Sequence, residues 1–189
     1  MKWKLVVSLL AVLSFFGATA HAQDVPKVDI FAGYSYLRAN PATTGVDSFS
    51  LNGGSASIAY NATSWLSGVA DFGGYASNNI LGTDKGGTLS TYLFGPRVTI
   101  RHFNRVTPFG QVLFGAAHIG SNVFGVTNSA NAFAMTVGGG VDVNLSHHFA
   151  VRPAQVDYLL TRFDETANTV TNTRSQNNLR VSTGVVFRF

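Results

Sequence analysis

The sequence predicts an all-β fold, an eight-stranded antiparallel transmembrane up-and-down β-barrel, and three observations support this prediction. Every second residue from Val181 to Phe189 is apolar or β-branched, whereas the residues between them are mostly polar, which is the pattern of a strand with one apolar face. Charged residues make up only 12% of the chain, about half the share usual in soluble domains. Finally, short turns alternate with long polar segments between the expected strands, which is the plan of a membrane barrel.

The N-terminal segment is typical of a secretory signal peptide. Two lysines near the start precede an apolar stretch over 5–16, and an Ala-His-Ala cleavage pattern ends at Ala22. The stretch is too short to span a bilayer, so we expect residues 1–22 to be removed and residues 23–189 to form one barrel domain. The chain has no cysteine, so we expect neither a lipid-anchored cysteine nor a disulfide.

Charge and composition narrow the class of protein. The formal net charge of +4 falls to +2 without residues 1–22, because that segment carries two lysines. This small net positive charge gives no reason to expect a nucleic-acid partner. After the signal peptide no run approaches the roughly 20 apolar residues of a membrane helix. A chain with 15 Phe and 20 Gly and so few charges suits a lipid-facing surface built from alternating strands.

The first four expected strands cover 27–38, 51–61, 65–76 and 88–101. Each has an apolar set at every second position, opposite a set that is largely polar. The apolar sets are Val28, Ile30, Ala32, Tyr34 and Tyr36; Gly54, Ala56, Ile58 and Tyr60; Leu66, Gly68, Ala70 and Phe72; and Tyr92, Phe94, Pro96, Val98 and Ile100. This period of two predicts strands with one face toward lipid.

The last four expected strands cover 107–118, 132–145, 149–163 and 176–189. The seventh has no clear phase near Pro153, where we expect a bulge because proline cannot donate to the strand ladder. The apolar sets of the other three are Val112, Phe114 and Ala116; Phe133, Met135, Val137, Val141, Val143 and Leu145; and Val181, Val185, Phe187 and Phe189.

The connections set the topology. Short turns are expected at 61–64, 102–106 and 146–148, and long segments rich in Asn, Thr, Ser and Gly at 39–50, 77–87, 119–131 and 164–175. Four long and three short connections imply eight strands with both termini on the short-turn side. An even count lets the eighth strand close against the first and removes both sheet edges.

Three segments resemble a known family. Residues 31–37 (Phe-Ala-Gly-Tyr-Ser-Tyr-Leu) resemble its first strand, 107–110 (Thr-Pro-Phe-Gly) the start of its fifth, and 181–189 its terminal strand. The chain thus resembles the small outer-membrane β-barrels of Gram-negative bacteria, the OmpA/OmpX-like proteins with an outer membrane protein β-barrel domain. The resemblance implies a location in the cell outer membrane, among its lipids and lipopolysaccharide. It also implies that the barrel-assembly machinery recognises the terminal strand ending at Phe189.

The polar phase of the strands carries charges of both signs: Asp29, Asp71, Asp142, Asp157, Arg97, Arg101, Arg152, Arg180 and Arg188. An eight-stranded barrel is just wide enough for its own side chains, and an unpaired charge there costs several kcal/mol. We therefore expect the pairs Asp142–Arg152, Asp71–Arg97 and Asp157–Arg180. Either these pairs block the barrel, or they gate a narrow ion path.

Aromatic side chains cluster near the expected strand ends, where an amphipathic ring suits the headgroup level of a membrane. We expect the following residues to form interfacial girdles: Tyr34, Tyr36, Tyr60, Trp65, Tyr75, Tyr92, Phe149, Phe187 and Phe189.

Signals for catalysis and metal binding are weak. His118 ends the fifth strand with Ser121 three residues on, but no acid follows at a suitable spacing, so a solvated histidine is the simpler interpretation. His147 and His148 are a candidate metal pair, but adjacent residues of an extended chain point in opposite directions. We assign no catalytic, cofactor-binding or metal residue, and we expect no cofactor and no enzyme.

Three functions remain open for the predicted barrel. The first is a structural or surface-interaction role, in which a filled interior supports long segments that contact an extracellular ligand of unknown identity. The second is a small channel or transporter for ions or small hydrophobic solutes. The third is an enzyme that modifies lipopolysaccharide. We expect the protein to be a monomer.

Overall fold

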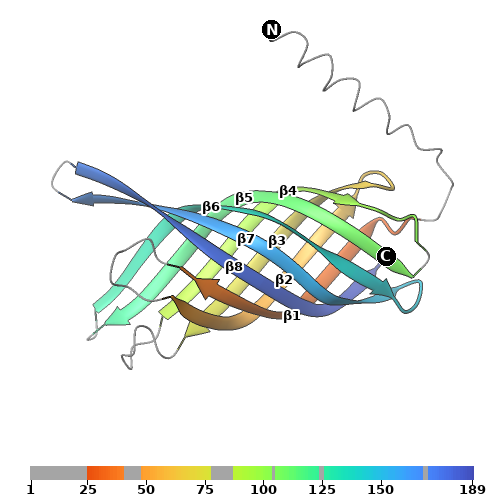
Figure 1. Cartoon of the computed structure of the whole chain (residues 1–189), viewed down its shortest axis with the longest axis horizontal. Helices are drawn as coiled ribbons and strands as arrows, with labels where there is room; N and C mark the ends of the chain where they lie inside the picture. Colours follow the sequence, from red (N-terminus) through yellow and green to blue (C-terminus); the bar gives the residue numbers. More distant parts are fainter. Residues whose placement is uncertain (1–24, 41–47, 78–86, 104, 124–125, 168–169) are drawn as a thin grey trace, which may run out of the picture.

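A computed structural model describes residues 25–40, 48–77, 87–103, 105–123, 126–167 and 170–189, and its regular structure there is all β (Figure 1). Each strand pairs antiparallel with the next, and the last pairs with the first, so the predicted closed eight-stranded barrel is confirmed. Among these residues no helix is long and apolar enough to cross a membrane. The strands are β1 (Val28–Ala39), β2 (Phe49–Asn61), β3 (Leu66–Ser77), β4 (Gly87–Thr99), β5 (Val106–Val123), β6 (Val126–Asn144), β7 (Phe149–Ala167) and β8 (Val170–Arg188).

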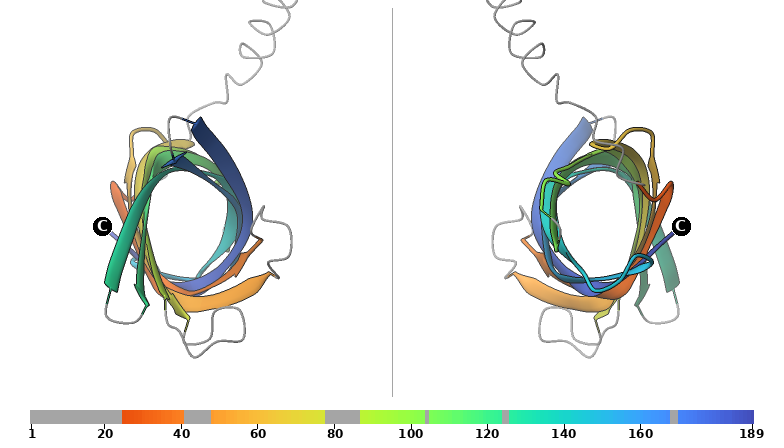
Figure 2. Two further views of the ribbon diagram at one scale, coloured as in Figure 1. Left: turned by 90° about the vertical axis from the view of Figure 1, so that its left-hand side faces the viewer. Right: turned by 90° about the vertical axis from the view of Figure 1, so that its right-hand side faces the viewer.

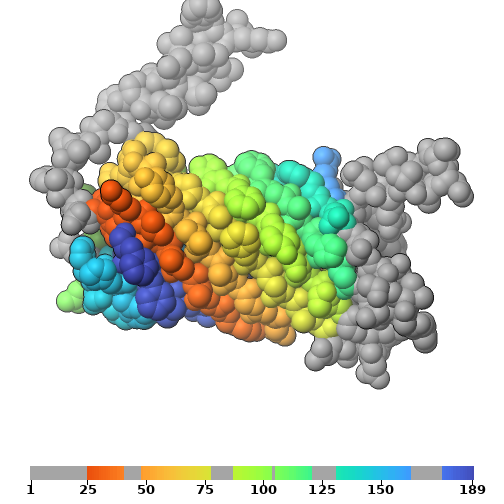
Figure 3. All heavy atoms as spheres, turned by 180° about the vertical axis from the view of Figure 1, so that it is seen from behind, coloured from red at the N-terminus to blue at the C-terminus, as the bar shows by residue number. Residues whose placement is uncertain are grey.

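Closure joins the two ends of the chain. β1 and β8 are in register from Asp29 opposite Arg188 to Arg38 opposite Leu179, and they run side by side along the wall (Figure 3). Two further backbone hydrogen bonds connect Val28 and Phe189, of 3.0 and 2.9 Å. Seen end-on, the strands form a complete ring (Figure 2). No strand edge is therefore left open within the membrane, where lipid could not satisfy its backbone groups.

The predicted alternation of the strands is confirmed. Outward side chains such as Phe94, Val98 and Phe133 are about half exposed on the isolated chain, at 53%, 48% and 50%. Their inward neighbours are buried, as Arg97 is at 4%. Because the outer face meets lipid rather than water, apolar exposure of this kind is what a membrane barrel requires.

β7 contains the expected bulge. Its register with β8 shifts between Arg152 and Gln155, and Pro153 and Ala154 both face outward. The extra residue inverts the phase of the strand, so Arg152 and Gln155 both point into the barrel although they are three positions apart. This inversion is why the phase could not be assigned from the sequence.

The connections at 61–64, 102–106 and 146–148 are short, as predicted. The interpretation of 119–131 and 164–175 as loops was wrong, because β5 and β6 pair up to Val123 opposite Val126, and β7 and β8 up to Ala167 opposite Val170. These segments are rich in Asn, Thr and Ser and lack the apolar alternation that marked the other strands, so their composition did not distinguish them from loops.

Two other long segments and the N-terminus are covered only in part. The first long segment was expected at 39–50, and its residues 41–47 lie outside the described residues. The second was expected at 77–87, and its residues 78–86 lie outside them as well. The same holds for the predicted signal peptide at 1–22.

The girdle prediction was wrong for Tyr75, which is 3% exposed and points into the barrel, and it stays a prediction for the other aromatic residues. Its ring lies over Gly73, where an added Cβ would come within 2.6 Å of the Tyr75 hydroxyl. In contrast, Tyr60 and Trp65, which flank the first short turn, are more than half exposed on the outer face. Alternation places Tyr75 with the inward residues, and its aromatic character alone misled the assignment.

Close packing at Gly53 gives a test of the wall. A Cβ at Gly53 would overlap the carbonyl oxygen of Gly74 and approach Cα of Tyr75 to 2.8 Å, whereas a Cβ at Gly74 would meet nothing within 4 Å. We expect Gly53→Ala to destabilise the barrel by about 1–3 kcal/mol through overpacking. Gly74→Ala, the matched control, should leave the urea unfolding midpoint unchanged or slightly raised. Equal effects of the two substitutions would contradict the register of β2 and β3.

Candidate functional site

The candidate site is the barrel interior, where a chain of ion pairs begins at the short-turn end. Asp29 lies 3.4 Å from Nη2 of Arg101 and 3.6 Å from Nε of Arg188. Arg188 also reaches Asp142, with Nη2 3.3 Å from Oδ2. These carboxylates therefore link β1, β6 and β8 with the turn that follows β4.

The predicted pair Asp142–Arg152 is confirmed. Arg152 donates from Nε to Oδ1 at 2.7 Å and from Nη2 to Oδ2 at 3.2 Å. Its guanidinium also lies 4.4 Å from the ring centroids of both Phe31 and Phe109. The two rings fit against the wall because Gly33 and Gly140 leave room for them. A bidentate carboxylate and two aromatic faces together compensate for burial of this charge.

Gln155 extends the chain past the bulge. It accepts from Nη1 of Arg152 at 2.7 Å and donates to Oδ2 of Asp157 at 2.7 Å. Both contacts depend on the inverted phase of β7, which turns all three side chains inward. The bulge thereby connects two groups of ion pairs. The first, near the short turns, contains Arg188, Asp142 and Arg152. The second, in the centre of the barrel, contains Asp157 and Arg180.

Arg180 is the centre of the second group. It lies 2.8 Å from Asp157, so that predicted pair is confirmed, and 2.6 Å from Asp71. It also donates to the hydroxyl of Tyr75 at 3.4 Å. The Asp71 contact crosses the lumen, because β1 and β2 separate β3 from β8 in the wall.

The predicted pair Asp71–Arg97 was wrong. Asp71 is held by Arg180, and Arg97 donates instead to Oε1 of Gln111, at 3.1 and 2.8 Å. The guanidinium of Arg97 lies 4.4 Å from the ring centroid of Phe109. The prediction compared only adjacent strands, whereas a narrow barrel allows a long side chain to reach a strand that is not its neighbour.

Arg97 is also the one interior arginine without an ion pair among the described residues. Four interior aspartates face five arginines, and the other four arginines each contact a carboxylate within 3.6 Å. Arg97 is 4% exposed. An amide oxygen and a π face compensate only part of the cost of burying this cation.

The loop-side half of the interior contains a buried apolar cluster, which was not predicted from the sequence. Its buried cluster joins several strands and includes Leu37, Leu51, Leu89, Leu93, Leu113, Leu159 and Tyr75. The signal was present, because each of these leucines occupies the inward phase of its strand. We had assigned that phase to polar residues on the evidence of the charges alone.

Both halves of the interior contain fully buried side chains. Arg152 and Arg180 in the charged half have 0% exposure, as do Leu93, Leu113 and Leu159 in the apolar half. A side chain that water cannot touch does not border a continuous water path. The interior side chains are therefore in contact with one another across the lumen.

The histidines singled out in the sequence lie apart from this network. His118 is exposed and its Nδ1 contacts Oδ1 of Asn131 at 2.8 Å, while the side chain of Ser121 lies outside the described residues. His147 and His148 are exposed in the last short turn, with ring centroids 5.1 Å apart. The described part of the chain contains no group of three His, Cys, Asp or Glu side chains that could hold a metal ion.

Comparison with known proteins gives one family and several structures. The family described as "Outer membrane protein beta-barrel domain" matches residues 8–189. No curated protein matches the chain in sequence.

Two of the similar solved structures are Neisserial surface protein A (NspA), at 13% identity and TM-score 0.68, and Ail, the attachment invasion locus protein of Yersinia pestis, at 16% and 0.60. They cover 86% and 87% of this chain, and 97% and 99% of their own chains. OprG from Pseudomonas aeruginosa is similar at 9% identity and TM-score 0.52, covering 87% of this chain and 97% of its own. At these sequence identities the similarity shows a shared fold alone.

The pair Asp142–Arg152 can be tested by a double-mutant cycle. Asp142→Ala or Arg152→Ala leaves a buried charge with fewer partners, so each should lower stability by about 3–5 kcal/mol, less where Arg188 or Gln155 compensates. The double variant should be less damaged than the sum of the two. The measurement is the urea unfolding midpoint of the barrel in detergent.

The pair Asp71 and Arg105 provides the control cycle. Asp71 is buried inside the barrel opposite Leu93, whereas Arg105 is exposed in the turn before β5 and belongs to none of the ion pairs described above. These two substitutions should be additive to within about 0.5 kcal/mol. Additivity in the cycle of Asp142 and Arg152 as well would mean that those two side chains do not meet.

Proposed function

The chain belongs to the outer membrane protein beta-barrel domain family, and from that premise we propose that it is a sealed barrel with a structural or surface-interaction role. In this proposal the wall anchors the protein in the outer membrane. The interior stabilises the wall and conducts nothing. The projecting hairpins meet an extracellular ligand.

The observation that carries the proposal is the filled interior. The charged half is cross-linked through Arg180, which binds carboxylates from β3 and β7 at 2.6 and 2.8 Å. Opening an ion path would separate these buried charges from their partners, at several kcal/mol for each. The leucine cluster of the loop-side half offers water no hydrogen bond, and the buried Asn178 and Thr161 beside it already bond to each other. Both halves favour a plug over a gated path.

The hairpin of β7 and β8 supports a role at the surface. β7 pairs with β6 only as far as Arg162, and β8 pairs with β1 only as far as Leu179. Beyond these points Phe163–Ala167 and Val170–Arg174 pair only with each other. The two strands reach far past the rest of the barrel (Figure 1). A ribbon of this kind adds nothing to barrel closure, so a contact outside the membrane is the role that it suits.

The partners in this proposal are those of an outer-membrane monomer. Outer-membrane lipids and lipopolysaccharide surround the apolar wall, and the barrel-assembly machinery engages the strand that ends at Phe189. The ligand of the hairpins is unidentified, and nucleic acid has no part.

A small apolar solute is the second candidate, because the loop-side cluster borders a recess of about 80 Å³ between Leu37, Leu51 and Leu89. The recess is smaller than the 300–1,000 Å³ usual for ligand sites, and the fully buried Leu93 and Leu113 lie in the same cluster. Lipopolysaccharide modification has less support, because His118 contacts Asn131 on the exposed face.

Conductance tests the sealed interior. Purified protein reconstituted in planar lipid bilayers should show no steady conductance above that of the lipid alone, because no water path crosses the buried side chains. Heat-modified migration on gels would show that the inserted protein is folded. A steady, ion-selective current from folded protein would contradict the plug and favour the channel.

Trimming the hairpin tests the surface role. Replacing 164–173 by Asn-Gly joins Phe163 and Arg174, which are paired, through a two-residue turn that suits a hairpin. We expect an unchanged unfolding midpoint and at least tenfold weaker binding to ligands found in an extracellular screen of the intact protein.

The control for the trimmed hairpin is an equivalent cut in the hairpin of β5 and β6. Residues 122–127 are replaced by Asn-Gly between Ser121 and Asn128, which are also paired. Undiminished binding by both trimmed proteins would contradict a role for the hairpins. A lowered midpoint would show that the ribbon of β7 and β8 belongs to the stabilised barrel.

A further inference from the structure

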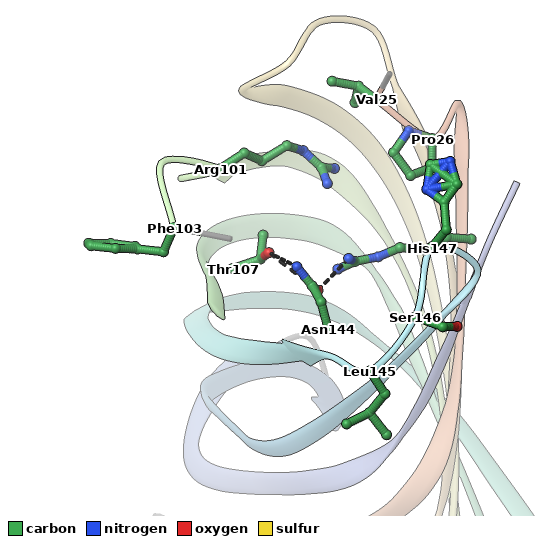
Figure 4. A pocket seen from close by; sticks show the side chains of 10 residues that line it. Val25, Pro26, Arg101, Phe103, Thr107, Asn144, Leu145, Ser146 and His147 are labelled. Carbon is green, nitrogen blue, oxygen red and sulfur yellow. Dashed lines mark hydrogen bonds between the residues drawn. The ribbon is translucent and has the colours of Figure 1, made fainter. Parts of the chain in front are cut away.

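The short-turn end of the barrel contains a hollow of about 480 Å³ (Figure 4). Its polar floor is formed by Arg101, Arg188 and Asn144, and its walls include Pro26 and Leu145. In Figure 4 the guanidinium of Arg101 points into the hollow. The hollow lies at the opposite end from the projecting hairpins, and no function considered so far uses it.

At the hollow, the guanidinium of Arg101 has a donor to spare, whereas the unbonded Nε of Arg188 is buried. Arg101 donates from Nε to the carbonyl of Ser64 at 3.1 Å and from Nη2 to Asp29 at 3.4 Å, which leaves Nη1 without a hydrogen bond to the described residues. Nε of Arg188 is buried and makes no hydrogen bond, its nearest carboxylate oxygen being that of Asp29 at 3.6 Å. Arg188 as a whole is only 5% exposed.

The ion pairs at the hollow are also longer than those inside the barrel. The three contacts of Arg101 and Arg188 with Asp29 and Asp142 measure 3.3–3.6 Å, whereas the pairs of Arg152 and Arg180 measure 2.6–2.8 Å. Strong charge-assisted hydrogen bonds are about 2.7–2.9 Å long. The cations at the hollow are therefore less fully satisfied by the protein's own carboxylates.

The local charge balance is positive. Asp29 is shared by Arg101 and Arg188, and Asp142 is shared by Arg188 and Arg152, so two carboxylates serve three arginines. None of the described residues that line the hollow is acidic. Among the described lining residues, a bound anion would therefore meet hydrogen-bond donors and no carboxylate.

We propose that this hollow binds an oxyanion, a carboxylate or phosphate group carried by a small and partly apolar molecule. Guanidinium groups present N–H donors in a planar fork that fits such oxyanions. The volume lies within the range usual for small-molecule sites, which also combine apolar walls with a few polar groups. The site goes beyond the proposed surface role and does not depend on it, because it lies outside the sealed part of the interior.

Binding can be measured with defined probes. The protein, reconstituted in nanodiscs of phosphatidylcholine, is titrated by calorimetry at low ionic strength with N-acetylalanine, N-acetylalaninamide and inorganic phosphate. We expect saturable binding of at least one anion, weakened by salt, and at least tenfold weaker binding of the neutral amide. The tighter anion identifies the carboxylate or phosphate source. Absence of saturable anion binding, or equal binding of the amide, would overturn the proposal.

Two matched variants locate the site. Arg101→Gln removes a guanidinium that lies outside the strands and should weaken anion binding at least tenfold. Arg105→Gln makes the same change in net charge at the same end, but Arg105 is exposed and does not line the hollow, so binding should stay within twofold. An unchanged affinity in Arg101→Gln, or equal losses in both variants, would rule out this site.

A measurement on the wild type covers the case in which Arg101→Gln does not assemble. The amide resonances of Thr107 and Asn144, which adjoin the hollow, should shift on titration with the tighter anion, while that of Leu93 in the sealed interior should not. Fixed resonances at Thr107 and Asn144 under saturating anion would overturn the proposal.

Discussion

The pairing of β1 with β8 is the constraint on which the rest of the structure depends. A strand in lipid must satisfy its backbone groups within the protein, and this pairing leaves none of the eight strands with an open edge in the wall. Eight strands enclose a space no wider than side chains. Every inward residue must therefore fit against those from the opposite wall, and every inward charge must find a partner there.

The interior meets this requirement differently in its two halves. Toward the short turns, charges from β1, β3, β6, β7 and β8 form a chain of pairs that passes through Arg188, Arg152 and Arg180. Toward the hairpins, leucines and alanines pack together, and the buried Asn178 and Thr161 bond to each other beside them. The apolar half keeps water from the central pairs, and a low local dielectric strengthens each satisfied contact. Burial of these charges and their stabilising contacts are thus linked in this interior.

The charges are least satisfied where the interior meets the short turns. Arg101 and Arg188 have longer contacts than the central arginines and border an open hollow. The surface hairpin of β7 and β8 lies at the other end of the barrel. The two proposed contact sites, the hairpin and the hollow, therefore lie at opposite ends of the barrel.

The sequence predicted much of the fold because alternation is local. A strand that faces lipid on one side has a period of two wherever it lies, so the strand phases, the closed topology and the bulge at Pro153 could be anticipated. The ion pairs Asp142–Arg152 and Asp157–Arg180 could also be predicted, because each pair joins two strands that are adjacent in the sequence and in the sheet. The hairpin extensions were missed, because these polar segments carry no such period.

What only the tertiary structure decided are the contacts between strands that are not neighbours. Asp71 meets Arg180 across the lumen, Arg97 has Gln111 and Phe109 in place of a carboxylate, and Tyr75 points inward. These contacts depend on the tilt and diameter of the closed ring, which arise from all eight strands together. The sequence by itself determined which face is inside for every strand except β7, and the closed barrel decided which inward side chains meet.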